Sequence, residues 1–296
     1  MTLGSITSSF IDGERRDALK AFQRSQRKVL SLYGLAGSSA AVALAAFPLR
    51  KDAPPMLVVG DSADDAGYIY HDLTRLCGDQ AVAMFPSGYR RDIRYGQADG
   101  PSEILRTEAL NRWHAADGLR FVVTYPEAIA ERVASRTLID SHTIRFDRAK
   151  ETDMTEAIIW LRENGFAQVD YVYEPGQFAS RGSILDIFGY NSELPLRIDF
   201  FGDEIDSIRR FNVETQLSEE RLESVAVTSG VAGSVQGESL LRFIPEDTLI
   251  ALRDEAYTAA RVRDLSGATL SANALIAGDT DSDAMSRLVD PDEFDS

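Results

Sequence analysis

The pattern of apolar residues changes near residue 136, and this change limits the folds open to the chain. Before it, short and continuously apolar stretches occur at residues 55–62 and 81–87, and a third at residues 119–129 runs into a helix through Tyr125 and Pro126. Segments with the spacing of amphipathic helices separate them, at residues 63–77 and 101–115. Continuous apolar strands that alternate with amphipathic helices are typical of a parallel sheet covered on both faces. The first part of the chain therefore predicts an α/β domain.

From residue 137 to about residue 215, apolar and polar residues alternate, as they do in antiparallel strands with one exposed face. One amphipathic helix is expected at residues 153–164, because Gly165 follows it as a C-terminal glycine. Turn signals separate the strands at residues 175–176 (Pro-Gly), 191–192 (Asn-Ser) and 202–203 (Gly-Asp). This part predicts a small α+β domain with an antiparallel sheet.

The sequence after residue 222 returns to the first pattern. Residues 225–230 have the composition of a strand, residues 245–247 form a turn before a strand at 248–254, and residues 254–265 have the composition of a helix. We expect this part to re-enter the first domain and complete its sheet, before a strongly acidic tail at residues 279–296. We call the α/β domain the lobe. Its first part is expected at residues 1–136, the inserted domain at 137–222, and its second part, with the tail, at 223–296.

The net charge of −16 over 296 residues limits the functions open to the chain. Duplex DNA is bound mainly by Lys and Arg side chains that neutralise phosphates, so the whole surface of this protein is not a nucleic-acid clamp. The single cysteine, Cys77, excludes an internal disulfide or a cysteine-based zinc site, and we expect it to pack as a small apolar residue. The scattered His71, His114 and His142 are expected to be structural or solvated, and no metal site is predicted.

Neither a secretion signal nor a membrane span is predicted. The first residues lack a basic segment followed by an apolar one. The most apolar stretch, residues 35–49, is shorter than a membrane span and contains Ser38, Ser39 and Pro48. We therefore expect a soluble cytoplasmic protein that does not contact a membrane.

Residues 32–47 have the strand, loop and helix grammar of a phosphate-binding loop. The Walker A loop, G-x-x-x-x-G-K-[ST], needs its Lys to contact the phosphates and its Ser or Thr to bind Mg²⁺. The corresponding run here is Gly34, Leu35, Ala36, Gly37, Ser38, Ser39, Ala40 and Ala41. Ala40 stands in place of the Lys, Ala41 in place of the Mg²⁺ ligand and Ser39 in place of the second glycine. The run is either a degenerate ATP site or a turn without that ancestry, and both interpretations predict no ATP hydrolysis here.

Residues 168–217 resemble a known family. The run contains EPGQF (174–178), RG (181–182), LDIF (185–188), RIDFFGDE (197–204), DSI (206–208) and VETQ (213–216). This pattern closely resembles the UvrB-homology module of Mfd, the bacterial transcription-repair coupling factor. UvrB shares the R-G and F-F-G-D-E parts, whereas E-P-G-Q-F and V-E-T-Q favour Mfd. A weaker resemblance extends to residues 85–97 and 243–250.

The resemblance implies an α/β, helicase-like (degenerate P-loop NTPase) parallel-sheet lobe with an inserted small α+β antiparallel-sheet domain. In this family the inserted domain binds UvrA, the damage-recognition ATPase. The implied function is a non-catalytic module that recruits UvrA to stalled RNA polymerase in transcription-coupled nucleotide excision repair. RNA polymerase and duplex DNA would be bound by domains that this chain lacks. ATP and Mg²⁺ would likewise belong to the missing motor domains, and no cofactor is expected in this fragment.

The strand at residues 196–201 is the expected binding site. Leu196, Ile198 and Phe200 share one face, which leaves Arg197, Asp199 and Phe201 on the other. An exposed aromatic beside an arginine is typical of an interaction hot spot, although another strand or a turn could cover Phe201. The resemblance places the UvrA-contacting residues at Arg181, Arg197 and Phe201, where the two arginines could form bidentate pairs with partner carboxylates. Lower-ranked candidates for extending the patch are Arg145, Arg209 and Arg210.

The alternative interpretation is a DNA-binding helicase fragment of UvrB type. A Lys at position 40 and a tyrosine-rich hairpin would favour it. Position 40 is an alanine, and the tyrosines of residues 88–100 are just two, Tyr89 and Tyr95. Weak DNA contact remains open through the basic side chains of residues 14–32, which are Arg15, Arg16, Lys20, Arg24, Arg27 and Lys28. An independent enzyme has little support, because Asp203 and Glu204 lie in a hairpin turn where solvated carboxylates are normal.

Overall fold

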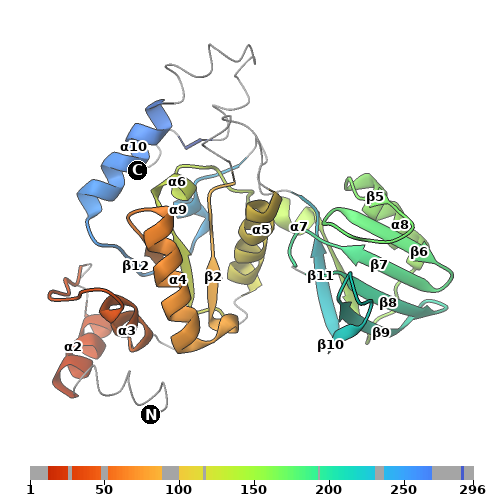
Figure 1. The fold of residues 1–296 in the computed structure, drawn as a ribbon, viewed down its shortest axis with the longest axis horizontal. Helices are drawn as coiled ribbons and strands as arrows, with labels where there is room; N and C mark the ends of the chain where they lie inside the picture. The colour runs from red at the N-terminus through yellow and green to blue at the C-terminus, as the bar shows by residue number, and fades with distance from the viewer. Residues whose placement is uncertain are drawn as a thin grey trace.

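The computed structural model describes residues 13–25, 29–47, 53–88, 100–115, 118–192, 194–230, 237–268 and 288–289. A parallel sheet with its helices lies on the left of Figure 1, and an antiparallel sheet lies on the right. The predicted mixed α/β fold with separate parallel and antiparallel sheets is confirmed.

The parallel sheet has the strand order β12-β1-β3-β2. Its strands are β1 (Met56–Val59), β2 (Val82–Met84), β3 (Phe121–Thr124) and β12 (Ile250–Ala251). Every neighbouring pair runs parallel, and β1 and β3 are buried at all positions, as expected for strands covered on both faces. The three predicted strands are confirmed. So is the return of the chain to this sheet, because β12 pairs with β1.

Helices surround this sheet in Figure 1. They are α2 (Gly13–Arg24), α3 (Ser39–Ala45), α4 (Ala63–Cys77), α5 (Gly100–Ala115), α6 (Pro126–Ile129), α9 (Leu240–Phe243) and α10 (Glu255–Ala268), with a short 3₁₀ helix η1 (Asp79–Ala81). Helix α4 begins at Ser62, whose Oγ accepts a hydrogen bond from the Asp65 N–H at 3.2 Å. The helix follows β1 so closely that a Cβ on Gly60 would lie 2.6 Å from the Ala66 nitrogen. The predicted helices at 63–77, 101–115 and 254–265 are confirmed.

One ion pair lies inside this lobe. Arg106 Nη1 is 2.9 Å from Glu131 Oε2, and the two side chains are 2% and 3% exposed. The arginine also donates to the Pro86 carbonyl at 2.7 Å and stacks on the Phe85 ring at 4.2 Å. The carboxylate accepts from the Gly88 N–H at 2.8 Å. These contacts join the end of β2 to α5 and to the segment after α6, and we call Arg106 and Glu131 the sealed pair.

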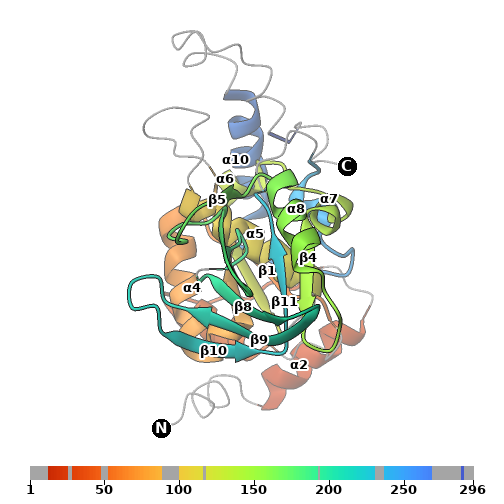
Figure 2. The same cartoon turned by 90° about the vertical axis from the view of Figure 1, so that its right-hand side faces the viewer.

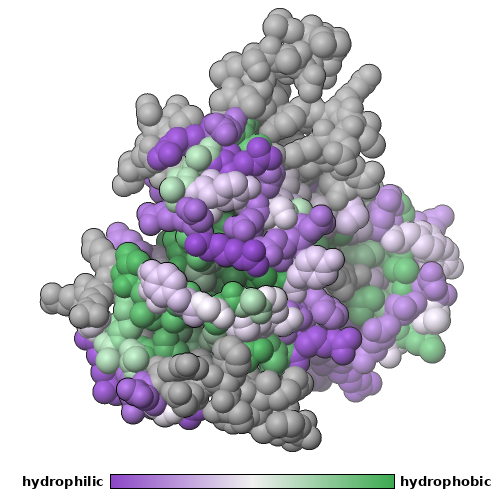
Figure 3. Space-filling model, turned by 60° about the vertical axis from the view of Figure 1, so that its left-hand side comes forward, coloured by the Kyte–Doolittle hydropathy of each residue, from purple (hydrophilic) through white to green (hydrophobic). Residues whose placement is uncertain are grey.

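The strand expected before the alanine-rich helix is not formed. Residues 29–36 contain neither helix nor strand, and Val29 and Tyr33 are 74% and 90% exposed. Helix α3 follows as expected, but the phosphate-loop prediction is wrong about the strand. The edge strands of the parallel sheet are β12 and β2, and residues 29–36 pair with neither. Figure 3 shows the surface of the lobe from another side. Polar residues lie over α10, and apolar residues are exposed below them, level with α3.

The antiparallel sheet has six strands in the order β10-β9-β8-β7-β6-β5. They are β5 (Ala167–Gln168), β6 (Gln177–Arg181), β7 (Ile184–Phe188), β8 (Leu196–Phe201), β9 (Glu204–Phe211) and β10 (Ser218–Leu222), and only the β5–β6 pair is parallel. Helix α8 (Met154–Glu163) starts at Asp153, whose side chain accepts from the Thr155 N–H at 2.6 Å. The predicted helix at 153–164 is confirmed, and Gly165 follows it with a φ of 81°.

A third, two-stranded sheet joins the two larger ones. Strand β4 (Thr143–Asp147) pairs with β11 (Ser224–Thr228) in antiparallel register. The prediction that residues 225–230 complete the lobe's sheet is therefore wrong. Helix α8 lies beside β4 in Figure 2, and Phe146 of β4 shares a core with Ala157 and Leu161 of α8.

Two short helices were not predicted. Helix α7 (Arg136–Ser141) lies where alternating strands were expected to begin, and α9 lies just before the expected turn at residues 245–247. Each begins at a serine that caps it. Ser135 Oγ accepts from the Leu138 N–H at 3.3 Å, and Ser239 Oγ accepts from the Arg242 N–H at 3.3 Å. These caps are local signals that the hydrophobic pattern alone does not show.

The buried hydrophobic residues form separate cores. One surrounds the parallel sheet, and a second lies between the antiparallel sheet, α8 and the β4–β11 pair. The chain leaves and re-enters the lobe at one place, where Val133 and Glu238 exchange backbone hydrogen bonds of 2.8 Å and 2.9 Å.

Candidate functional site

The antiparallel sheet has one apolar and one polar face, and β8 shows the division clearly. Leu196, Ile198 and Phe200 are at most 5% exposed and lie in the core shared with α8. Phe201 is 80% exposed. The predicted alternation is confirmed, and the alternative in which Phe201 is covered is wrong. Gly202 follows it with a φ of 65°, so the tight β8–β9 turn presents the aromatic ring at its edge.

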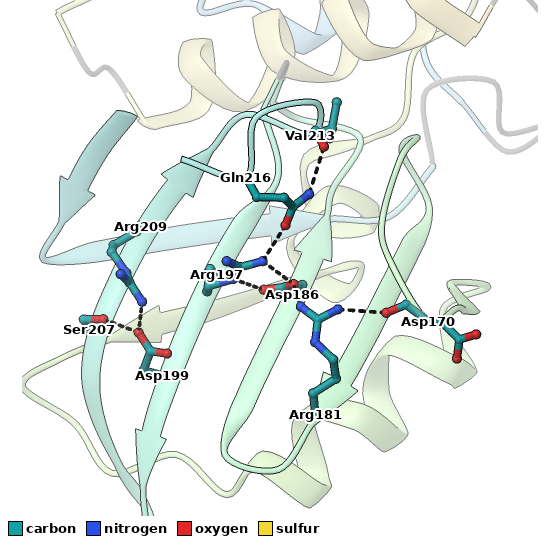
Figure 4. A network of polar contacts seen from close by, with 9 residues as sticks. All are labelled: Asp170, Arg181, Asp186, Arg197, Asp199, Ser207, Arg209, Val213 and Gln216. Atoms are coloured by element: carbon teal, nitrogen blue, oxygen red, sulfur yellow. Dashed lines mark hydrogen bonds and ion pairs between the residues drawn. The ribbon is translucent and has the colours of Figure 1, made fainter. Parts of the chain in front are cut away.

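Asp186 on β7 organises the polar face. Its side chain is 2% exposed and accepts hydrogen bonds from both arginines singled out in the sequence. Oδ1 accepts from Arg197 Nε at 2.7 Å, and Oδ2 accepts from Arg197 Nη2 at 2.8 Å and from Arg181 Nη2 at 2.5 Å. Figure 4 shows the carboxylate between the two guanidinium groups. We call these three residues the Asp186 network.

Each guanidinium group also has contacts away from the carboxylate. Arg181 Nη1 donates to the Asp170 carbonyl at 2.8 Å, and its guanidinium lies 4.7 Å from the centre of the Tyr171 ring. Arg197 Nη2 donates to Gln216 Oε1 at 3.0 Å, and its guanidinium lies 4.3 Å from the centre of the Phe211 ring. Hydrogen bonding to Asp186 raises the pKa of Arg197 further above its usual value. Both arginines therefore have defined orientations.

These contacts revise the expectation of bidentate pairs with a partner. Arg197 already uses its Nε and Nη2 atoms as a fork on Asp186. Its side chain is 18% exposed, whereas that of Arg181 is 36% exposed. Arg181 is thus the more accessible guanidinium, and Arg197 presents an edge already fixed within the protein.

A second carboxylate continues the polar face along β8. Asp199 Oδ2 accepts from Ser207 Oγ at 2.6 Å and pairs with Arg209 Nη2. Arg209 lies opposite Arg197 in the strand register and so shares this face. Arg210 lies opposite Leu196 and pairs with Glu220 at 2.6 Å.

Of the residues proposed to extend the patch, the structure brings Arg209 to the polar face. Arg210 belongs to the other side of β9, because residues alternate along a strand. Arg145 is exposed on β4, in a different sheet. The sequence interpretation missed Asp186, whose position in LDIF between two apolar residues places it on the face opposite Leu185 and Ile187. It also missed Tyr171 and Gln216, which come from connecting segments and have no comparable signal.

The run compared with a Walker A loop, residues 34–41, forms a turn that leads into α3. Gly34 and Gly37 have φ angles of 78° and 53°, and Ser39 Oγ accepts from the Ala36 N–H at 2.6 Å. Ser38 precedes the helix but makes no side-chain cap. Ala40 and Ala41 lie within α3, and Ala41 is 1% exposed in the core. Helix α3 therefore packs against the core of the lobe through Ala41.

The remaining single-residue expectations have mixed outcomes. Cys77 is partly rather than fully buried, and burial raises the pKa of its thiol. His142 Nδ1 lies 3.0 Å from the Leu138 carbonyl and His71 is exposed, whereas the side chain of His114 lies outside the described residues. The described residues contain no cluster of three or more potential metal ligands. In that same part of the chain, no helix is long and apolar enough to cross a membrane.

The predicted DNA-contact segment is described only in part. Helix α2 carries Arg16, Lys20 and Arg24, while the side chain of Arg15 and residues 26–28 lie outside the described part. The hairpin region with Tyr89 and Tyr95 and the acidic tail, apart from residues 288–289, also lie outside it.

Residues 144–230 match the family model of the UvrB interaction domain. This segment contains the whole antiparallel sheet, with Arg181, Arg197 and Phe201. The transcription-repair-coupling factor of Escherichia coli K12 is 26% identical over 195 residues, and that of Bacillus subtilis 168 is 29% identical over 197 residues. The Staphylococcus aureus USA300 protein is 26% identical over 223 residues.

The chain is similar to the transcription-repair coupling factors. The alignments cover 66% of this chain for the first two relatives and 75% for the third. They cover only 17%, 16% and 18% of those relatives, so the aligned part of the chain spans about a sixth of the length of the coupling factors it matches. The resemblance predicted from residues 168–217 is confirmed.

Proposed function

We propose that this chain is a non-catalytic, UvrB-like module that binds UvrA in transcription-coupled nucleotide excision repair. Its similarity to transcription-repair coupling factors supports the coupling role, and the match to the UvrB interaction domain supports UvrA as the partner. In this proposal, RNA polymerase and duplex DNA are contacted by other parts of a longer protein. The chain itself brings UvrA to them.

The observation that carries the proposal is the exposed Phe201 at the end of β8, the strand that also carries Arg197 of the Asp186 network. A large aromatic side chain that is 80% exposed has no evident role in folding. Tyr171 and Tyr173, at 53% and 65% exposure, are further exposed aromatics in the segment before β6. Aromatic and arginine side chains are enriched in the cores and hot spots of protein interfaces. The polar face therefore has the residues of a protein-binding surface.

The lobe serves as the scaffold in this proposal. We propose that it is a degenerate helicase-like domain that hydrolyses no ATP, because Ala40 and Ala41 stand where phosphoryl transfer needs Lys and a Mg²⁺ ligand. We also propose the division into lobe and inserted domain. The first boundary belongs nearer residue 142 than residue 136, because Ile139 of α7 packs in the core of the lobe. The second boundary belongs nearer residue 230 than residue 222, because Val227 of β11 packs in the second core.

A binding assay with purified UvrA tests the function. The wild-type chain is immobilised and UvrA is titrated over it, in parallel with a Phe201→Ala variant. We expect the substitution to weaken binding by about 30-fold, which corresponds to about 2 kcal/mol for a hot-spot residue. Because Phe201 is exposed, thermal unfolding of the variant should match that of the wild type.

Two matched variants control the assay. Tyr68→Ala removes an aromatic of similar exposure, 76%, from α4 in the lobe. Arg162→Ala removes an exposed arginine from α8, which covers the apolar face of the sheet. Both should bind UvrA as the wild type does. Unchanged affinity in a folded Arg181→Ala, Phe201→Ala double variant would refute the proposed site.

A further inference from the structure

The position of Asp186 is unusual for a carboxylate. It lies in the middle of β7, is 2% exposed, and has Arg197 directly opposite on β8 and Ala179 directly opposite on β6. The small Ala179 side chain leaves room for Arg181, two residues further along β6, to reach back to the same carboxylate. Burying a carboxylate is unfavourable unless charged donors surround it, and here both oxygens have them.

The fold alone does not call for a charge at this position. On the same side of the sheet, Ala179, Phe188 and Phe211 form a small apolar core with Val172. That end of the face is therefore covered by hydrophobic side chains. Replacing all partners of a buried ion pair by apolar residues is often neutral or stabilising, whereas removing one partner alone is destabilising. Apolar residues in place of Asp186, Arg181 and Arg197 together would therefore satisfy the fold. The charged residues lie where the face becomes accessible.

The contacts of Asp186 act on the two arginines of the proposed site. Free arginine side chains have many rotamers, and fixing them during association reduces affinity. Asp186 fixes Arg197 through two hydrogen bonds and Arg181 through one. Gln216 holds Arg197 from the other side. It is the one non-glycine residue with a positive φ, 60°, in the described part of the chain. Its side-chain nitrogen donates to the Val213 carbonyl at 2.8 Å.

We propose that Asp186 is a positioning residue that sets both arginines in their binding orientation before the partner arrives. This inference rests on the proposed function for its partner but concerns a residue that need not touch the partner. It predicts that removing the charge of Asp186 weakens binding through Arg181 and Arg197. The variant Asp186→Asn should bind UvrA about tenfold or more weakly, because two long side chains must then be ordered during association.

The first test measures the arginines without any partner. In ¹⁵N-labelled wild-type protein, the Nε–Hε groups of Arg181 and Arg197 should give sharp, dispersed signals. In Asp186→Asn these signals should broaden or move to the position of free arginine, while the backbone spectrum stays folded. Asp65→Asn, which removes a carboxylate paired with Arg253 in the lobe, should leave both signals unchanged. Unchanged arginine signals in Asp186→Asn would overturn the inference.

The second test separates positioning from a structural role. In the background Arg181→Ala, Arg197→Ala, the added change Asp186→Asn should restore stability, because it removes an unpaired buried charge. It should not change the affinity for UvrA, which the two arginine substitutions have already weakened. If Asp186→Asn alone does not fold, Asp186→Glu keeps the charge and moves the oxygens by one methylene, and weaker binding is expected.

The outcomes distinguish this inference from the proposed function. Wild-type affinity in Asp186→Asn, with Arg181→Ala still defective, would overturn the role of Asp186 and leave the function standing. Absence of UvrA binding by the wild-type chain would refute the function, while the arginine signals would still show whether Asp186 fixes the two side chains.

Discussion

The sealed pair and the Asp186 network use the same chemistry in different surroundings. In the lobe, Arg106 stacks on Phe85 and pairs with Glu131, and both side chains are at most 3% exposed. In the antiparallel sheet, Arg181 stacks on Tyr171 and pairs with Asp186, but its own side chain is 36% exposed. The first arrangement is closed to any partner, whereas the second leaves guanidinium edges at the surface. Accessibility, rather than the type of contact, separates a structural network from a candidate binding site.

The comparison predicts the largest loss of stability for the sealed pair. Glu131→Ala leaves the Arg106 charge buried and unpaired, which should cost about 3–5 kcal/mol of unfolding free energy. Urea unfolding followed by circular dichroism measures the change. Glu127→Ala, which removes the partner of the half-exposed Arg261, is the control and should cost clearly less. Equal losses for the two variants would show that the sealed pair has no special weight.

An intermediate loss is expected for the second carboxylate of the polar face. Asp199 accepts from Ser207 and pairs with Arg209, whose side chain is 27% exposed. Asp199→Ala should cost about 1–2 kcal/mol, because hydrogen bonds to a charged group are lost but water can reach the arginine. The same urea measurement applies, with the exposed turn residue Asp203→Ala as control. A loss as large as that for Glu131 would contradict the ranking by exposure.

The smallest effect is expected at the surface. Arg148 and Glu223 form an ion pair of 3.0 Å, with side chains 41% and 85% exposed. Glu223→Ala should change the unfolding free energy by about 0–1 kcal/mol, and any difference should vanish at about 1 M NaCl, where screening acts within about 3 Å. The sealed pair should keep its contribution at that salt concentration. A loss of unfolding free energy in Glu223→Ala that persists at about 1 M NaCl would contradict the ranking of these ion pairs by exposure.

Much of the fold could be predicted from the periodicity of the sequence. The buried strands β1, β2 and β3 and helix α4 were predicted because continuous apolar runs and helical spacing are strong local signals. The pairing of β11 was not, since residues 225–230 suit several sheets and only the β4 register decides among them. The strand expected before Gly34 was predicted wrongly for a related reason. The short apolar run before Gly34 suits a strand, but these residues pair with neither edge strand of the parallel sheet, β12 or β2.

The candidate site was predicted in part. Alternation along residues 196–201 correctly placed Phe201 outside and Leu196, Ile198 and Phe200 inside. The same alternation would have placed Asp186 on the polar face, but it could not show that Arg181 folds back across Ala179 to reach it. Gln216 and Tyr171 approach from segments whose conformations depend on tertiary contacts. Side-chain partners between strands therefore limited the prediction more than the strands themselves.

The paired backbone of Val133 and Glu238 has a consequence for how such proteins can diversify. A Cβ on Gly237 would lie 2.5 Å from the Val133 oxygen, so the outgoing and returning segments approach as closely as a glycine allows. The segment between these two residues therefore leaves the lobe and returns to it at the same place. The entropy of closing such a segment rises only with the logarithm of its length. The lobe can therefore carry inserted domains of very different size and sequence at this position. A new inserted domain would add its own binding surface without altering the lobe.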